Sequence, residues 1–337
     1  MTMSTAIYFS PEGGRLLGKN QDVPYQGAYL FTNKRGVAKS ALVQPPELPA
    51  KWISRYGSLT VSQVGKEMPN GGINETGLVV EQTTLWQSAY TDNDRLPAIG
   101  ELQWIQLILD TCATVKEAEQ VACGVRIAQP MSRLHYMVGD RSGDCAIFEF
   151  LGGVMCVFRG NSLPVSIMAN TPYSQAIKDL EDKEERWRNV YNDYDGNSMD
   201  RFVKGVARLA AVIPDSERER LQFARETLQF VRREDTAYSL IYDLEQKQLH
   251  FATSIYPDLK TVRMSEVDFS SDAVPLALNL QQPAVSYMNY NADLNRRVAE
   301  SFFREPVLTK AFGWSITDDM IDFIASFPDR FPKAADV

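Results

Sequence analysis

The residue types that usually cleave bonds in hydrolases are not arranged in a familiar motif in this sequence. It contains no G-x-S-x-G elbow, no S-x-x-K, no P-loop and no G-x-G-x-x-G fingerprint. The two histidines, His135 and His250, each lie in an alternating run that is typical of a strand, and no H-E-x-x-H motif or third ligand accompanies them. We therefore expect no metal site, and a hydrolase of this sequence needs a base other than histidine.

A hydroxyl or thiol nucleophile can use its own α-amine as the base when it is the first residue of the mature chain. A free α-amine has a pKa of about 7.7 to 8.0, so it accepts a proton near neutral pH. Such chemistry requires Ser, Thr or Cys at the start of a strand. Ser4 opens a strand-like run of this kind, and Gly18-Lys19-Asn20-Gln21-Asp22 follows after a turn.

Five patches of the sequence resemble, in the same order, the choloylglycine hydrolase and penicillin V acylase family. Members of that family begin with Cys-Thr, a short strand, a turn and Gly-Arg-Asn-x-Asp. The other four patches are Asn74-Glu75-Thr76-Gly77-Leu78, Leu134-His135 with Gly139-Asp140, Ala169-Asn170-Thr171-Pro172, and Asp200-Arg201-Phe202. The resemblance covers most of residues 4–265 and implies an N-terminal-nucleophile hydrolase of linear amide C–N bonds.

The resemblance implies a catalytic role for five matched residues. Ser4 is the nucleophile, and its freed α-amine is the base. Asp22 would orient that amine and stabilise the ammonium formed from it. The Asn74 side chain, with a backbone N–H, would donate to the tetrahedral oxyanion, and Asn170 would position nucleophile and substrate. Arg201 would add a permanent positive charge.

Each of these residues also has an ordinary structural interpretation. Asp22 and Asn74 can be turn residues beside proline or glycine. Asn170 can form an Asx turn before Pro172, and Arg201 can be an exposed residue of a helix. Taken singly, each residue fits the structural interpretation, whereas the set in family order favours the functional one.

Three residues are predicted to contact the substrate. Lys19 replaces the arginine of the family, and lysine offers a compact charge without the bidentate guanidinium fork. Trp86 and Tyr90 lie in residues 85–97, which are either a loop bordering the substrate or an ordinary mobile loop.

Ser4 stands where the family has a cysteine. A serine hydroxyl is a weaker nucleophile than a thiol, although serine serves in other N-terminal-nucleophile enzymes, and the change is either natural or engineered. Removal of Met1 alone would expose Thr2. Ser4 becomes terminal only after residues 1–3 are lost, so we interpret them as a leader and the chain as an uncleaved precursor.

Hydrophobic periodicity predicts the elements that must position these residues. Alternating runs predict antiparallel strands at residues 5–9, 16–20, 28–32, 58–64, 77–83, 134–139, 145–150, 154–159, 165–169, 238–244, 248–253 and 261–264. Helices are predicted around residues 102–112, after the capping box of Thr114 and Glu117, and at 174–188, 199–212 and 216–232. This order favours an α+β fold, the four-layer αββα sandwich.

We expect one compact unit. Residues 1–3 are the leader, 4–270 form the hydrolase domain, and 271–337 form a C-terminal helical extension packed on the same domain. The extension should contain two short helices, the second introduced by Thr317 and two aspartates, since acids suit the first turn of a helix.

Composition excludes several other classes of protein. The net charge of -8, with basic residues scattered among acids, disfavours nucleic acid as a partner. No apolar run approaches the roughly 20 residues of a membrane span. We expect a soluble chain, cytoplasmic as it stands, and periplasmic or secreted if a signal peptide was removed. The 4 cysteines are too few and too widely spaced for a disulfide scaffold or a zinc site.

The sequence thus predicts hydrolysis of a linear, non-peptide amide through an acyl-enzyme at position 4, with no metal or organic cofactor. The resemblance implies a small N-acyl amide such as a conjugated bile salt, penicillin V or an N-acyl homoserine lactone. The alternative is a catalytically silent binding protein, or a precursor inactivated by a Cys-to-Ser change. Acyl transfer to another amine and assembly into a homo-oligomer both stay open.

Overall fold

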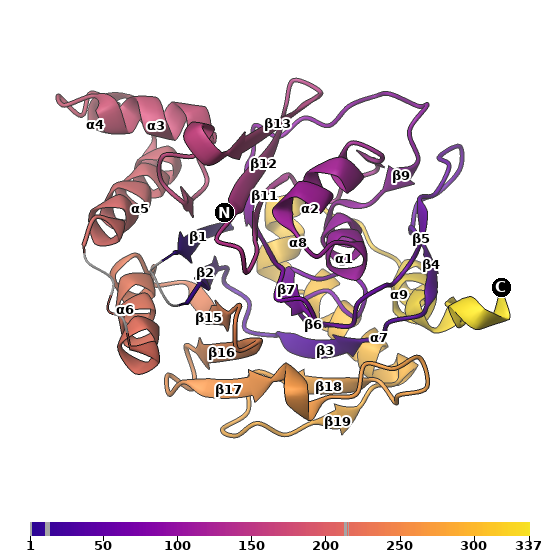
Figure 1. Ribbon diagram of the computed structural model, residues 1–337. Coiled ribbons are helices and arrows are strands. Elements are labelled where there is room, and N and C mark those ends of the chain that lie inside the picture. Colours follow the sequence, from indigo (N-terminus) through magenta and orange to yellow (C-terminus); the bar gives the residue numbers. More distant parts are fainter. Residues whose placement is uncertain (1, 11–13, 212–213, 215) are drawn as a thin grey trace.

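The computed structural model describes residues 2–10, 14–211, 214 and 216–337, which form two large antiparallel sheets with helices outside them (Figure 1). In the first sheet the strand order is β14 (Ile167–Met168), β1 (Met3–Phe9), β2 (Leu16–Asp22), β15 (Thr236–Asp243), β16 (Gln248–Thr253) and β17 (Lys260–Arg263). In the second it is β13 (Val154–Arg159), β12 (Cys145–Leu151), β11 (Leu134–Gly139), β8 (Val79–Thr84), β7 (Gly71–Asn74), β6 (Ser58–Ser62), β3 (Tyr29–Asn33), β18 (Leu276–Asn279) and β19 (Met288–Asn289). Two short pairs join β4 (Ala38–Ser40) to β5 (Lys51–Ile53) and β9 (Ala98–Ile99) to β10 (Arg126–Ile127).

The helices cover the outer faces of both sheets. They are α1 (Glu101–Thr111), α2 (Val115–Ala122), α3 (Tyr173–Glu181), α4 (Trp187–Val190), α5 (Asp193–Leu209), α6 (Glu217–Phe230), α7 (Ala292–Phe303), α8 (Pro306–Phe312) and α9 (Asp318–Ser326). Helices α5 and α6 pack on β1, β2, β14 and β15, whereas α1 and α2 pack on β7, β8 and β11 (Figure 1). Strands β1 and β8 contact each other between the two sheets. This layering confirms the predicted αββα sandwich.

Alternation along β1 decides which side chains face which layer. The Tyr8 hydroxyl donates to the Asp140 carbonyl beyond β11 at 2.9 Å, so Tyr8 faces the second sheet. The Phe9 ring instead packs edge-on against Phe223 of α6, with centroids 6.2 Å apart. Because side chains of a strand alternate, Ser4 shares the face of Tyr8 and Thr5 that of Phe9. Ser4 therefore faces the space between the sheets.

Local signals placed most helices, with two differences. The helix predicted at residues 199–212 begins earlier, at residue 193, and residue 212 lies outside the described residues. Thr114 Oγ1 accepts from Glu117 N at 3.2 Å, and Glu117 Oε2 accepts from Ala113 N at 2.6 Å, so a capping arrangement opens α2 as predicted. The helix expected at residues 174–188 is divided into α3 and α4. Between them Glu185 has a left-handed backbone, with φ of 46°, and Asp182 accepts a hydrogen bond from Arg186 N, which ends the helical path.

The C-terminal part also contributes to the second sheet, beyond the expected domain boundary at residue 270. Strand β18 pairs with β3, so the second sheet continues into residues 276–279, and the segment after residue 271 is not purely helical. It also contains three α-helices, α7 to α9, where two were expected. Flanking Pro and Gln made the strand resemble a loop, and its pairing partner lies about 250 residues away in the chain. No helix among the described residues is long and apolar enough to cross a membrane.

Candidate active site

The main chain of Ser4 is held by two buried polar side chains. Ser4 N donates to Asn170 Oδ1 at 3.1 Å, and Arg201 Nη1 donates to the Ser4 carbonyl at 2.7 Å. Arg201 Nη1 also donates to Thr5 Oγ1, which faces α5 because of the alternation of β1. Residues more than 160 positions apart thus meet at the start of β1.

Asn170 links three elements at this point. Its Oδ1 accepts from Arg201 Nη2 at 2.7 Å as well as from Ser4 N, and its Nδ2 donates to the Thr84 carbonyl at the end of β8 at 2.7 Å. Its own backbone N–H donates to Ser198 Oγ of α5 at 2.8 Å. The Asn170 side chain therefore bridges β1, β8 and α5.

Asp22 and Arg201 form the charged part of the site. Both are buried, with exposed fractions of 0% and 3%, and Arg201 Nη1 lies 3.8 Å from Asp22 Oδ2. Thr236 Oγ1 donates to Asp22 Oδ1 at 2.6 Å, whereas Oδ2 has no hydrogen-bond partner among the described residues. Burial raises the pKa of Asp22, although the Arg201 charge and the Thr236 hydrogen bond oppose this. Asp22 pairs with Met3 between β1 and β2, so an acceptor oxygen without a hydrogen bond lies next to the residue that precedes Ser4.

The Ser4 hydroxyl points away from these groups. It donates to the carbonyl of Met3, the residue before it, and lies 3.4 Å from Gln21 Oε1. Gln21 in turn donates to Gln63 Oε1 at 3.2 Å. The Ser4 nitrogen is a peptide nitrogen, which has no basic lone pair, so the hydroxyl has no α-amine base in this form of the chain.

Asn74 does not join the other four residues, and its predicted role is contradicted. Its Nδ2 donates to the carbonyls of Leu109 and Cys112 at 2.8 and 2.7 Å, which satisfies the C-terminal end of α1. Its Oδ1 accepts from Thr76 N and Leu78 N at 3.0 and 3.1 Å within the turn between β7 and β8. This turn lies at the opposite end of β8 from Thr84, so Asn74 cannot donate to an oxyanion formed at Ser4.

Lys19 is also displaced from its predicted role in substrate binding. It is 1% exposed, its Nζ lies 3.1 Å from Glu81 Oε2, and it donates to the Gln82 carbonyl. Tyr242 donates to the other oxygen of Glu81 at 2.6 Å. Burial lowers the pKa of Lys19 and raises that of Glu81, each opposed by the partner. Lys19 is thus part of a buried ion pair between the sheets.

The two aromatic residues of 85–97 have different surroundings. The Trp86 ring lies 6.0 Å from that of Phe312, which lines the cavity described below, so a substrate contact of Trp86 remains a prediction. Tyr90 accepts a hydrogen bond from Leu134 N at 3.0 Å and packs on Phe150 at 5.2 Å. Tyr90 is partly buried and packs against the core between the second sheet and α1, and it is not among the described residues that line the cavity, so the structure does not support its predicted substrate contact.

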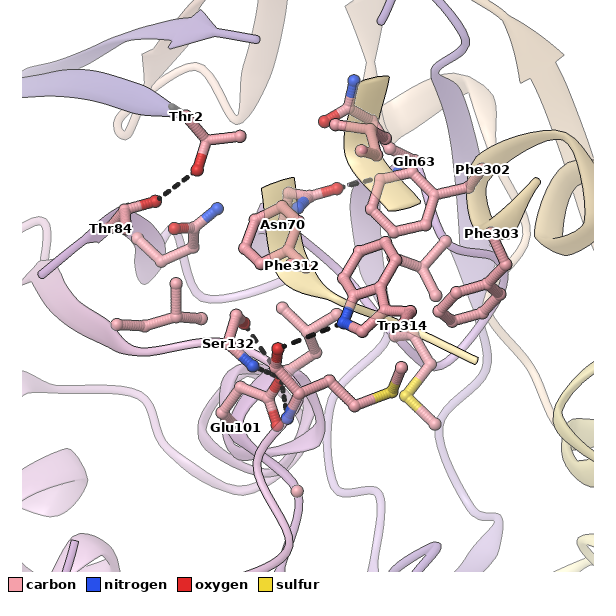
Figure 2. A pocket seen from close by; sticks show the side chains of 18 of the residues that line it. Thr2, Gln63, Asn70, Thr84, Glu101, Ser132, Phe302, Phe303, Phe312 and Trp314 are labelled. Carbon is pink, nitrogen blue, oxygen red and sulfur yellow. Dashed lines mark hydrogen bonds between the residues drawn. The ribbon is translucent and has the colours of Figure 1, made fainter. Parts of the chain in front are cut away.

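A mostly apolar cavity of about 140 Å³ opens beside Ser4 (Figure 2). Thr2, Gln21 and Thr84 border it near Ser4, and Figure 2 shows Phe302 and Phe303 on the side opposite Thr2 and Thr84. Thr2 Oγ1 lies 3.2 Å from Thr84 Oγ1, so the residue two places before Ser4 occupies this border. Of the three predicted leader residues, Thr2 and Met3 are described, and Met1 lies outside the described residues.

Several residues of the site were missed in the sequence. Gln21 lies inside the predicted motif, and strand alternation from Lys19 would have placed it on the face of Ser4. Thr236 had no local signal, because it meets Asp22 across 214 residues. The aromatic residues after 300 were visible only as a local enrichment. Among the described residues no group of three or more His, Cys, Asp or Glu side chains is arranged to hold a metal ion.

Comparison with known proteins identifies the family. Residues 55–276, more than half of the chain, match the linear amide C–N hydrolases of the choloylglycine hydrolase family. The chain belongs to this family. The match includes Asn170 and Arg201 of the site and begins after Ser4 and Asp22. It confirms the resemblance found in the sequence patches.

Individual relatives agree with the family assignment. The penicillin V acylase of Pectobacterium atrosepticum is 28% identical over 182 residues, which are 49% of this chain and 48% of that protein, so the alignment spans about half of the relative. The solved penicillin V acylase from Agrobacterium tumefaciens has a TM-score of 0.70 and 22% identity, covering 86% of this chain and 98% of that one. A mutant conjugated bile acid hydrolase from Clostridium perfringens has a TM-score of 0.62 and 16% identity, covering 86% and 97%. At these identities the two structures show the shared fold.

Proposed function

We propose that this chain, once the residues before Ser4 are removed, hydrolyses a linear non-peptide amide through an acyl-enzyme on Ser4. The observation that carries the proposal is the setting of Ser4. Its main chain is fixed by Asn170 and Arg201 beside the open oxygen of Asp22, while its hydroxyl faces the border of an apolar cavity. Family membership supports the reaction class.

The proton path in this proposal uses the freed α-amine. The amine takes the Ser4 hydroxyl proton as Oγ attacks the acyl carbon, and the proton then passes to the nitrogen of the departing amine. Asn170 Oδ1 already accepts from this nitrogen, and Asp22, whose Oδ2 has no hydrogen-bond partner among the described residues, is the nearby carboxylate that stabilises the ammonium. Water repeats the sequence to release the acid. Asn74 has no part in this mechanism.

The proposed substrates are small N-acyl amides with an apolar acyl group. Two similar proteins are named penicillin V acylase and one is named conjugated bile acid hydrolase, which supports a small N-acyl substrate. The apolar cavity beside Ser4 suits the acyl part, because burial of apolar surface is favourable and needs no directed partner.

A silent precursor or binding protein is the second candidate, and one observation favours it. Ser4 N is in peptide linkage to Met3, and Thr2 borders the cavity through its contact with Thr84. In this form the Ser4 hydroxyl lacks its α-amine base, and Thr2 forms part of the cavity border. The two candidates differ in whether cleavage before position 4 produces activity.

The decisive experiment is Ser4→Cys, with Ser4→Ala as the matched control. A thiolate is the better nucleophile for the Met3–Ser4 peptide bond and for substrate. The intact mass of Ser4→Cys should fall by residues 1–3, and hydrolysis of N-acyl anilides should appear with that loss, while Ser4→Ala stays uncleaved and inactive.

A fusion protein that is cut to leave Ser4 first tests the natural residue directly. It should be active without any substitution. If both cleaved proteins fail to hydrolyse a panel of short, long and aromatic acyl anilides, the binding-protein candidate is favoured. If Ser4→Cys stays full length while the cut fusion is active, another protease exposes Ser4.

A further inference from the structure

The cavity beside Ser4 has a wall made by the C-terminal part of the chain. This aromatic wall consists of Phe302 and Phe303 at the end of α7, Phe312 at the end of α8, and Trp314. All four residues lie outside residues 55–276, the range that matches the family. The wall is therefore built by a region other than the one that assigns the chain to its family.

A glycine in a left-handed conformation shapes the wall. The rings of Phe312 and Trp314 stack in parallel, with centroids 4.5 Å apart and an angle of 6° between their planes. Gly313 between them has a φ of 66°, and a Cβ at this position would meet nothing within 4 Å. Glycine adopts this backbone angle without strain, so the left-handed conformation, and not a lack of space for a side chain, favours glycine at this position.

Neighbouring side chains hold the stacked rings in place. The Trp314 ring lies 5.3 Å from Phe302 and 5.4 Å from Phe303, so α7 supports it from one side. Trp314 Nε1 donates to the Met131 carbonyl at 3.5 Å, which ties the wall to the turn before β11 (Figure 2). The wall is therefore packed on two elements and is not a free loop.

A buried carboxylate lies beside the wall. Glu101, which is 5% exposed, lines the cavity, and its Oε1 accepts from Met131 N, Ser132 N and Ser132 Oγ at 3.1, 3.0 and 2.9 Å. These hydrogen bonds fix the turn that receives Trp314. Burial raises the pKa of Glu101, whereas the hydrogen bonds from Ser132 and Met131 favour its ionised form. In that form the carboxylate disfavours a second negative charge in the cavity.

We propose that the aromatic wall determines the acyl specificity of this site, taking neutral apolar acyl groups of about one aromatic ring, while Glu101 excludes anionic ones. The inference rests on the proposed function, because it assigns the cavity to the acyl part of the substrate. The cavity volume of about 140 Å³ is close to the roughly 150 Å³ of an apolar engineered cavity that binds benzene.

Binding to the full-length chain tests the wall without requiring catalysis. Phenylacetamide should bind, as measured by titration calorimetry, and Trp314→Ala should weaken its binding about tenfold through loss of an aromatic contact. The control is Phe323→Ala on α9, because Phe323 is 39% exposed and is not among the described residues that line the cavity. It should leave binding unchanged. Trp314→Leu and Phe312→Leu replace Trp314→Ala if that protein does not fold.

Turnover by the cleaved Ser4→Cys protein separates this inference from the proposed function. Trp314→Ala should lower kcat/KM about tenfold for phenylacetyl 4-nitroanilide, and Glu101→Gln should raise kcat/KM for glutaryl 4-nitroanilide. If both anilides are hydrolysed but folded Trp314 variants change neither binding nor the ratio of kcat/KM, the inference is overturned and the proposed function stands. If neither anilide is hydrolysed while binding still depends on Trp314, the proposed function fails and the wall remains a binding surface.

Discussion

The two ends of the cavity beside Ser4 are built by different parts of the chain and by different interactions. At the proposed catalytic end, Asn170 and Arg201 hold the Ser4 main chain through hydrogen bonds of 2.7 to 3.1 Å, and Asp22 lies beside them. At the proposed acyl end, stacked aromatic rings from residues 302–314 form an apolar wall. The first end lies in the patches that resemble the family, and the second lies beyond the matched residues.

This difference follows from the directionality of the interactions. A hydrogen bond requires a particular donor or acceptor within about 3 Å and near a straight angle, so few residue types can replace Asn170 or Arg201. Apolar contacts are non-directional, and many side chains can fill the same volume. Residues that act through directed hydrogen bonds can therefore be recognised as a motif in the sequence, whereas the residues of an apolar wall cannot.

The largest expected effect is at the catalytic end, in Arg201→Met. Removal of one partner of a buried ion pair costs about 3–5 kcal/mol, because Asp22 is left buried and uncompensated. The folded-state pKa of Asp22, already raised by burial, then rises further above its unfolded value. The part of the destabilisation that comes from Asp22 should be complete above the folded pKa and should disappear as pH falls below the unfolded pKa of about 4. The loss of the hydrogen bonds to Ser4, Thr5 and Asn170 remains at every pH.

Chemical denaturation at pH 8 and at pH 4 measures this effect. The difference in unfolding free energy between Arg201→Met and the parent should shrink at pH 4. An equal loss at both pH values would show that Asp22 is not the group left unpaired.

Lys19→Met tests a residue that lies in the same motif as Asp22 but outside the proposed catalytic end. We expect a loss of about 3 kcal/mol from the unpaired Glu81, larger at pH 8 than at pH 5, since Glu81 can be neutralised by protonation. After cleavage before position 4, kcat/KM of the folded protein should be unchanged. If kcat/KM falls because KM rises for every acyl group, Lys19 contacts the substrate and this prediction is wrong.

Asn74→Ala likewise tests whether a residue in a patch that resembles the family can have a structural role and no role in catalysis. It removes the donor to the Leu109 and Cys112 carbonyls and should cost about 2 kcal/mol. Thermal unfolding measures that loss, and kcat at a temperature where the variant is folded should match the parent. Asn170→Ala is the contrasting variant, and it should abolish activity.

The smallest effect is expected at the acyl end, in Gly313→Ala. The left-handed backbone at this position costs a residue with a Cβ about 1 kcal/mol, and no clash adds to it. Stability should fall by that amount, and KM should rise for phenylacetyl but not for acetyl anilides as the rings lose their alignment. A change in kcat for acetyl anilides would contradict the separation of the two ends.

Local patterns predicted much of the fold. The strand Leu134–Gly139 was predicted with the bounds it has, because the apolar residues Leu134, Tyr136 and Val138 recur at every second position around His135. The capping residues of α2 were predicted because they act over three or four positions. The pairing of β18 with β3 was missed, because its short sequence gains strand character only from a partner far along the chain.

The residues of the candidate site were also predicted only in part. Ser4, Asp22, Asn170 and Arg201 could be recognised in family order from the sequence alone, because this needs only residue type and spacing. The tertiary structure was needed to show that Asn74 completes a helix end and that Lys19 neutralises Glu81, since both roles depend on partners more than 30 positions away. It also decided that aromatic residues after position 300 reach the cavity beside Ser4, because apolar packing carries no local signature of its partner.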